Sequence, residues 1–177
     1  MKKLIVVLAL LIAGLAQASQ VNWALSSAAD AGGSKVRIWT FIASDSSGST
    51  AKTLSQADAI AMITAGNYTD LKTYNQKGGV LTDAGTFTGA YTTDNASWGA
   101  NVTVSGYAII FDTTDKNLDG VANYMVTDLQ TVKFTNAADS KTFNVTPSGT
   151  WTAVPEPTSA LLMLIGVAGL ALRRRRV

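Results

Sequence analysis

The stretch Val-Thr-Val-Ser-Gly-Tyr-Ala-Ile-Ile-Phe at residues 102–111 is the strongest strand signal in the chain and decides its fold class. β-Branched and aromatic side chains dominate it, and these favour extended backbone. A further strand is expected at residues 121–126. The turn-rich residues 112–120 separate the two, so we predict that they pair as neighbours in a sheet.

A second strong strand is predicted at residues 35–43, where apolar side chains recur on both faces of the extended backbone. A strand that is apolar on both faces belongs in the centre of a sheet. Shorter strands are expected at residues 21–25, 80–82, 86–92, 131–134, 142–145 and 150–152. Many short strands with close turn signals are typical of an antiparallel β-sandwich or a barrel-like fold.

One short helix interrupts this β pattern. Ser55 is a candidate N-cap with Asp58 three residues later, and Gly66 is placed to end the helix. A helix this short depends on docking for its stability, so we expect it to dock across an open end of the sheet and cover the edge of the core, with lining a ligand site as the alternative.

The C-terminus has three distinct parts. Pro155 and Pro157 flank Glu156 in Val-Pro-Glu-Pro-Thr-Ser, which excludes helix and central strand there. Residues 160–172 carry no polar side chain, and Arg173, Arg174, Arg175 and Arg176 follow. The cationic block predicts a membrane segment with its arginines on the cytoplasmic side. At about 20 Å the segment is short for a hydrocarbon core of about 30 Å. This length favours a removable tail, with a permanent anchor and a buried core helix as alternatives.

The N-terminus has the form of a secretory signal peptide. Two lysines precede the apolar residues 4–15, and Ala16-Gln-Ala18 is a small-x-small cleavage site. We expect cleavage after Ala18, which leaves Ser19 as the first residue of the exported protein.

The C-terminal residues 154–177, in the order proline motif, apolar helix and arginine cluster, resemble the PEP-CTERM sorting signal of exported Gram-negative bacterial proteins. The resemblance implies an exosortase-type processing enzyme, with the Sec translocon and signal peptidase acting before it. It implies a transient stay in the inner membrane and then the cell surface or the extracellular space. It also implies a link to exopolysaccharide and biofilm.

Between these targeting segments lies a predicted β domain at residues 19–153. It holds eight Lys and Arg against eleven Asp, so its net charge is 8 − 11 = −3, and the basic pI comes from the two ends. No basic stripe offers itself to phosphates, which excludes nucleic acid as a natural partner. The chain has no cysteine, so no disulfide stabilises the domain.

The composition argues against catalysis. The chain has no histidine and no cysteine, and its one glutamate is Glu156 in the proline motif. Ser-His-Asp and Cys-His sites are therefore excluded, as are histidine and thiolate metal sites. We predict a protein without enzymatic activity and without an obligatory cofactor.

Two features suggest ligands. Asp115, Asn117 and Asp119 with Gly120 match the start of a calcium loop, although position 12 is Val126 in place of glutamate. A plain Asp-Gly hairpin explains the same residues. Trp98 lies among polar residues and is a candidate for stacking on a sugar ring, with core packing as the alternative.

These observations predict an exported structural or adhesive protein of the cell surface or extracellular polysaccharide. The alternative is a carbohydrate-binding module, calcium-assisted, that uses Trp98 and the loop at residues 115–120.

Overall fold

The structure is a computed structural model that describes residues 19–25, 36–48, 52–81, 91–95, 98–136, 139–145 and 150–155. The predicted signal peptide at residues 1–18 and the predicted membrane segment at residues 160–172 lie outside these ranges. Within the described ranges, no helix has the length and apolar character needed to span a bilayer.

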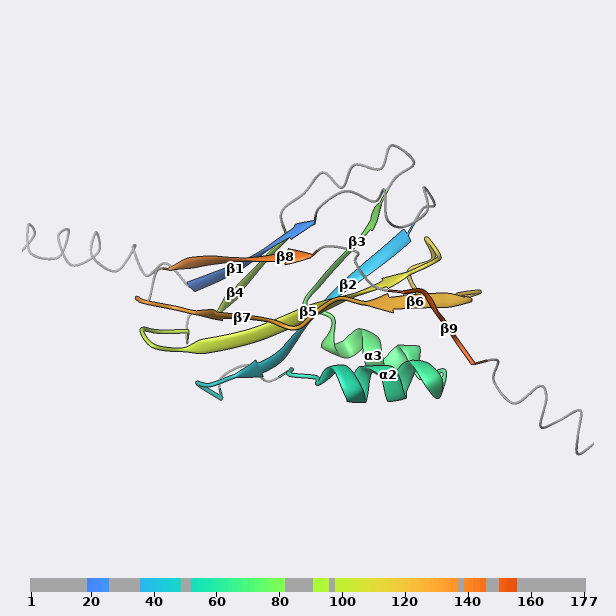
Figure 1. The fold of residues 1–177 in the computed structure, drawn as a ribbon, viewed down its shortest axis with the longest axis horizontal. Helices are drawn as coiled ribbons and strands as arrows, with labels where there is room; N and C mark the ends of the chain where they lie inside the picture. The colour runs from blue at the N-terminus through green and yellow to red at the C-terminus, as the bar shows by residue number, and fades with distance from the viewer. Residues whose placement is uncertain are drawn as a thin grey trace, which may run out of the picture.

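The described strands form two sheets (Figure 1). The larger sheet has the order β3-β2-β5-β6-β9, and β7 pairs with β5 beside β6. Its strands are β2 (Val36–Asp45), β3 (Lys77–Leu81), β5 (Thr103–Phe111), β6 (Asn123–Val126), β7 (Gln130–Lys133) and β9 (Thr152–Ala153). The smaller sheet has the order β4-β1-β8, with β1 (Ser19–Leu25), β4 (Tyr91–Asn95) and β8 (Ser140–Val145).

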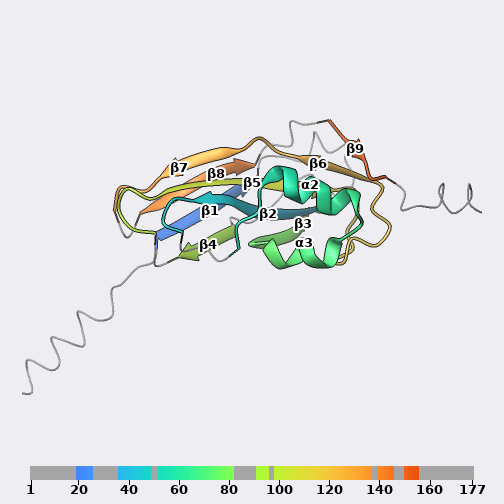
Figure 2. The same ribbon diagram turned by 90° about the horizontal axis from the view of Figure 1, so that it is seen from below.

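The domain has three layers. The strands β2 and β5 lie in the middle layer and are buried on both faces. Figure 1 shows the small sheet, the large sheet and the helices stacked in that order, and Figure 2 shows both helices on one side of the large sheet. One core lies between the sheets and includes Trp23, Ile110 and Phe143. The other lies under the helices and includes Phe41 and Tyr107. The predicted central position of the strand at residues 35–43 is thus confirmed.

The pairing of β5 with β6 is also confirmed, with Ile109 opposite Val126 and Phe111 opposite Tyr124. The sandwich alternative is the observed one, since the described strands do not close into a barrel. The sheets are not purely antiparallel, because β1 runs parallel to β8. These two strands come from opposite ends of the domain, so no local turn signal could fix their relative direction.

The expected helix is α2 (Gln56–Thr64). Ser55 caps it by accepting the Asp58 amide at 3.1 Å, and Gly66 follows the helix with φ +70°. The Tyr107 hydroxyl donates to the Leu54 and Ser55 carbonyls at 3.0 and 3.1 Å, which ties the helix start to β5. Burial raises the pKa of Tyr107, so this donor keeps its proton at ordinary pH.

A second helix, α3 (Tyr68–Tyr74), was not expected from the sequence. It has seven residues, no side-chain cap and one buried residue, Leu71. Such a helix is stabilised by docking and not by local propensity. The prediction of a single helix is therefore wrong.

Candidate functional site

The sorting motif begins where the large sheet ends. Ala153 and Thr152 of β9 pair with Asn123 and Tyr124 of β6. The Val154 amide then donates to the Ala122 carbonyl at 2.8 Å, and the Val154 side chain packs on the core under the helices. Pro155 is exposed, and it is the only residue of the predicted Pro155, Glu156 and Pro157 motif within the described ranges. No spacer separates the folded domain from the motif.

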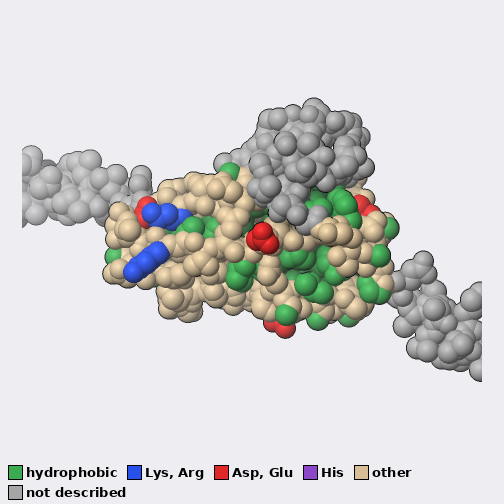
Figure 3. Space-filling view, in the orientation of Figure 1, with side chains coloured by type: hydrophobic (Ala, Val, Ile, Leu, Met, Phe, Trp, Pro, Cys, Tyr) green, Lys and Arg blue, Asp and Glu red, His purple; other side chains and the backbone are tan. Residues whose placement is uncertain are grey.

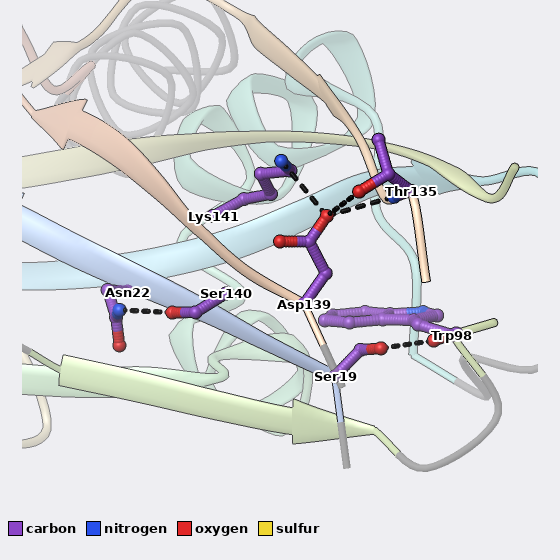
Figure 4. Close-up of polar contacts among 7 residues, drawn as sticks. All are labelled: Ser19, Asn22, Trp98, Thr135, Asp139, Ser140 and Lys141. Carbon is purple, nitrogen blue, oxygen red and sulfur yellow. Dashed lines mark hydrogen bonds and ion pairs between the residues drawn. The ribbon is translucent and has the colours of Figure 1, made fainter. Parts of the chain in front are cut away.

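The other predicted processing site also adjoins a strand. Ser19 is the first residue of β1, it is fully buried, and its hydroxyl donates to the Trp98 carbonyl (Figure 4). Ala16 and Ala18 lie outside the described residues, as do the arginines at 173–176. The described ends of the domain, at β1 and β9, lie at opposite ends of its long axis (Figure 1).

Trp98 is a core residue. Its side chain has no exposed surface, its ring stacks on Phe134 with centroids 5.5 Å apart, and its Nε1 donates to Asp45 Oδ2 at 2.8 Å. A ring without exposed surface cannot stack on a sugar. The ligand role predicted for Trp98 is corrected to core packing, the alternative stated with it. The polar residues next to Trp98 in the sequence suggested an exposed side chain. The ring can nevertheless be buried, because its one polar group, Nε1–H, has its acceptor Asp45 inside the domain.

The predicted calcium loop is organised by its own hydrogen bonds. Asp115 Oδ1 accepts the amides of Asn117 at 2.6 Å and Asp119 at 3.2 Å. These two bonds, that from Asn117 first, hold the pKa of the Asp115 carboxyl below its ordinary value. Leu118 fills the loop from inside, where it is buried with φ +64°. Gly120, at φ +72°, provides the second left-handed turn.

Neighbouring cations hold the same loop against the domain. Lys72 Nζ of α3 donates to Asn117 Oδ1 at 3.1 Å, and the Arg37 guanidinium of β2 donates to the Thr114 carbonyl. In the described part of the chain, no three acidic side chains are grouped closely enough to hold a metal ion. Calcium at Asp115, Asn117 and Asp119 stays a prediction.

A polar edge runs along β7 and β8. Its members are three hydroxyl and two amide side chains, namely Gln130, Thr131, Ser140, Thr142 and Asn144, and Lys133 and Lys141 lie among them. The three β8 members are exposed, while Phe143 and Val145 of the same strand are buried and Lys141 is partly exposed. Figure 3 shows that the Lys and Arg side chains visible on this face gather at the end of the molecule that holds β7 and β8, beside a largely uncharged surface. Sequence reasoning placed these strands but did not single out this edge, although the alternation in residues 140–145 carries the signal.

The Gln130 side chain closes this edge. Its Oε1 accepts the Asn144 amide at 2.9 Å and its Nε2 donates to the Asn144 carbonyl. A side-chain amide thus occupies the backbone groups that an added strand would use. The edge therefore offers side chains to a partner at this point and not its backbone.

Asp139 fixes the turn between β7 and β8. Its Oδ2 accepts the Thr135 amide at 2.9 Å and the Thr135 hydroxyl at 2.8 Å, and it lies 3.0 Å from Lys141 Nζ (Figure 4). These contacts, led by the Thr135 amide, lower the pKa of Asp139 to about 2. The ordinary pKa of an aspartate is about 3.9.

We expect this carboxylate to stabilise the domain above about pH 4, with the contribution lost as the pH falls through about 2. The sign follows because the unfolded chain takes up the proton first. Urea unfolding of the wild type and of Asp139→Asn at several pH values between 5 and 2 checks this. The wild type should lose more stability across that window than the variant, and equal losses would contradict it.

Comparison with known proteins agrees with the geometry of the C-terminal end. The family model of the PEP-CTERM protein-sorting motif matches residues 153–176, so the chain carries this motif. The resemblance drawn from the sequence is confirmed, and the motif implies export and processing by an exosortase-type enzyme. No curated protein matches the chain, and neither does any solved structure.

Proposed function

We propose that residues 19–153 form a non-enzymatic structural or adhesive component of the cell surface or extracellular matrix that contacts exopolysaccharide through the polar edge. The observation that carries the proposal is the row of exposed Ser140, Thr142 and Asn144 on β8. Hydroxyl and amide groups on a firmly held strand suit repeated hydrogen bonds to the hydroxyls of a polysaccharide.

The burial of the aromatic side chains supports an extended polar contact over a sugar-stacking pocket. Trp23, Trp39 and Trp98 are almost fully buried, and Trp151 is half-buried on the core. Contacts of this kind are individually weak, so affinity for a long polymer has to come from many chains or many repeats. Such behaviour suits a matrix component better than an enzyme.

The titratable side chains of the domain also support a non-enzymatic role. With no histidine or cysteine in the chain and no glutamate before Glu156, acid–base work in the domain would fall to aspartates. Asp45, Asp112 and Asp115 instead hold backbone amides and side chains in turns. Structural use of these carboxylates is in keeping with a non-enzymatic role.

Removal of the two central groups of the polar edge should weaken binding to exopolysaccharide. In Thr142→Ala/Asn144→Ala, two hydrogen-bonding side chains are lost at about 1 kcal/mol each, which corresponds to a weakening of roughly tenfold or more. The measurement is co-sedimentation of the purified protein with polysaccharide from the producing bacterium.

Thr69→Ala/Thr73→Ala on α3 is the matched control, because both threonines are exposed and lie on the opposite layer. The control should bind like the wild type. Equal binding by the β8 variant and the wild type would contradict the proposed surface. Tight, saturable binding to one short oligosaccharide on a glycan array would instead favour a carbohydrate-binding module.

A further inference from the structure

The last strand of the domain overlaps the sequence that the processing enzyme reads. The matched motif starts at Ala153, which is the second residue of β9. In the described part of the chain, the last hydrogen bond to the sheet is made by Val154, directly before Pro155. The same short segment therefore belongs to the fold and to the sorting motif.

Because of this overlap, the attachment of β9 determines how far the folded domain can lie from the membrane. The apolar segment starts at residue 160, six residues after Val154, and six extended residues span at most about 20 Å. While β9 stays on β6, the folded domain is held within that distance of the bilayer. If β9 leaves β6, the last strand that is still paired is the preceding one, β8, which ends at Val145. The fifteen residues from 145 to 160 then span up to about 50 Å.

The backbone hydrogen bonds of β9 also conflict with recognition of the motif by an enzyme. One way in which proteins recognise an extended peptide is to pair with its backbone as an added strand. The Val154 amide is already donated to Ala122, and Pro155 has no amide proton to offer. An enzyme that needs the backbone just before Pro155 competes directly with β6.

The attachment of β9 is local. Its ladder covers two residues whose side chains are exposed, and it is held further by the partly buried Trp151 and Val154 on either side. The pairs between β5 and β6 do not include β9. Release of β9 thus leaves the two-sided core of β2 and β5 in place, and local openings of this kind cost much less free energy than global unfolding.

We propose that β9 is a releasable strand that must leave β6 before the exosortase-type enzyme can engage the sorting motif. While attached, it protects the motif and keeps the domain close to the bilayer. Once released, it presents residues 150–157 as one extended peptide. The proposal rests on the sorting assignment and adds a conformational step to it.

A disulfide across β6 and β9 tests this step. The Val154–Ala122 bond makes the adjacent Asn123–Ala153 pair a non-hydrogen-bonded one, in which the Cβ atoms are close. Asn123→Cys/Ala153→Cys introduces the only two thiols of the chain, and exported proteins form disulfides. The readout is the fraction of full-length protein that loses its C-terminal segment in the producing bacterium, measured by intact mass.

We expect the processed fraction to fall at least tenfold in the cross-linked protein and to recover in each single-cysteine variant. Asn123→Cys alone also controls for the lost bond from Asn123 to Asp112. The matched control Thr103→Cys/Lys133→Cys cross-links β5 to β7 at another non-hydrogen-bonded pair, next to the Phe134–Val102 bond, and should be processed like the wild type. Wild-type processing of the β6–β9 cross-linked protein would overturn the proposal.

Hydrogen exchange gives an independent test that does not need the enzyme. In the wild type, the Val154 amide should exchange at least a hundredfold faster than the Ile109 amide of β5, and the cross-link should remove that difference. Equal protection of Val154 and Ile109 in the wild type would overturn the local release of β9. A wild-type chain that keeps its C-terminal segment in the bacterium would overturn the sorting assignment itself, and with it the proposal.

Discussion

Trp98→Ala is expected to lower the free energy of unfolding by about 3–5 kcal/mol, the range for removal of a large buried aromatic side chain. The ring is fully buried and stacks on Phe134, so its loss leaves a cavity between the sheets. Asp45 Oδ2 loses a donor at 2.8 Å in the same change. Urea unfolding followed by tryptophan fluorescence or circular dichroism measures the effect.

Trp98→Phe separates the two contributions. Phenylalanine keeps most of the apolar volume but cannot donate to Asp45, so the loss should be smaller, about 1–2 kcal/mol. A residue that serves a ligand would behave differently, with binding reduced and stability preserved. An alanine variant as stable as the wild type would contradict the core position of Trp98.

The sequence predicts the fold best where local pattern and burial agree. Residues 102–111 and 35–43 are apolar on both faces, and β5 and β2 are indeed covered by a sheet on one side and by helices on the other. The cap at Ser55 and the end at Gly66 were equally readable, because each depends on a residue type suited to one backbone position.

Features that depend on distant contacts were not predictable. The parallel pairing of β1 with β8 joins residues more than a hundred positions apart, and α3 depends on Leu71 reaching a core formed by other elements. Trp98 shows the same limit at a candidate site. Its neighbours in sequence are polar, yet its partners Phe134 and Asp45 are supplied by remote segments.

The two ends of the domain illustrate what sequence and structure contribute separately. The order of proline motif, apolar run and arginines identifies the sorting signal without any coordinates. The structure adds that the domain's last strand reaches into that signal and that Ser19 is buried at the start of β1. The matched motif thus begins on a strand of the large sheet, and the predicted cleavage after Ala18 would leave Ser19 at the start of β1 in the small sheet.

Gly106→Val is expected to prevent folding, and Gly106→Ala to cost about 1–3 kcal/mol or more. Gly106 lies in β5 and faces Trp23 and Phe143 of the small sheet. A Cβ there would come within 2.7 Å of both Phe143 Cε2 and Trp23 Cη2, and within 3.1 Å of the Phe41 carbonyl oxygen. Both rings are buried and pack on each other with centroids 4.9 Å apart, so neither can move without disturbing the other.

Gly99→Ala is the matched control, because a Cβ at Gly99 meets no atom within 4 Å, and its stability should stay close to that of the wild type. A double variant tests the named clash directly. Phe143→Leu removes one of the two rings, so Gly106→Ala should cost less in that background than in the wild type, which a double-mutant cycle of unfolding free energies resolves. Equal costs in the two backgrounds would mean that the close approach of β5 to β8 is not what excludes a side chain at position 106.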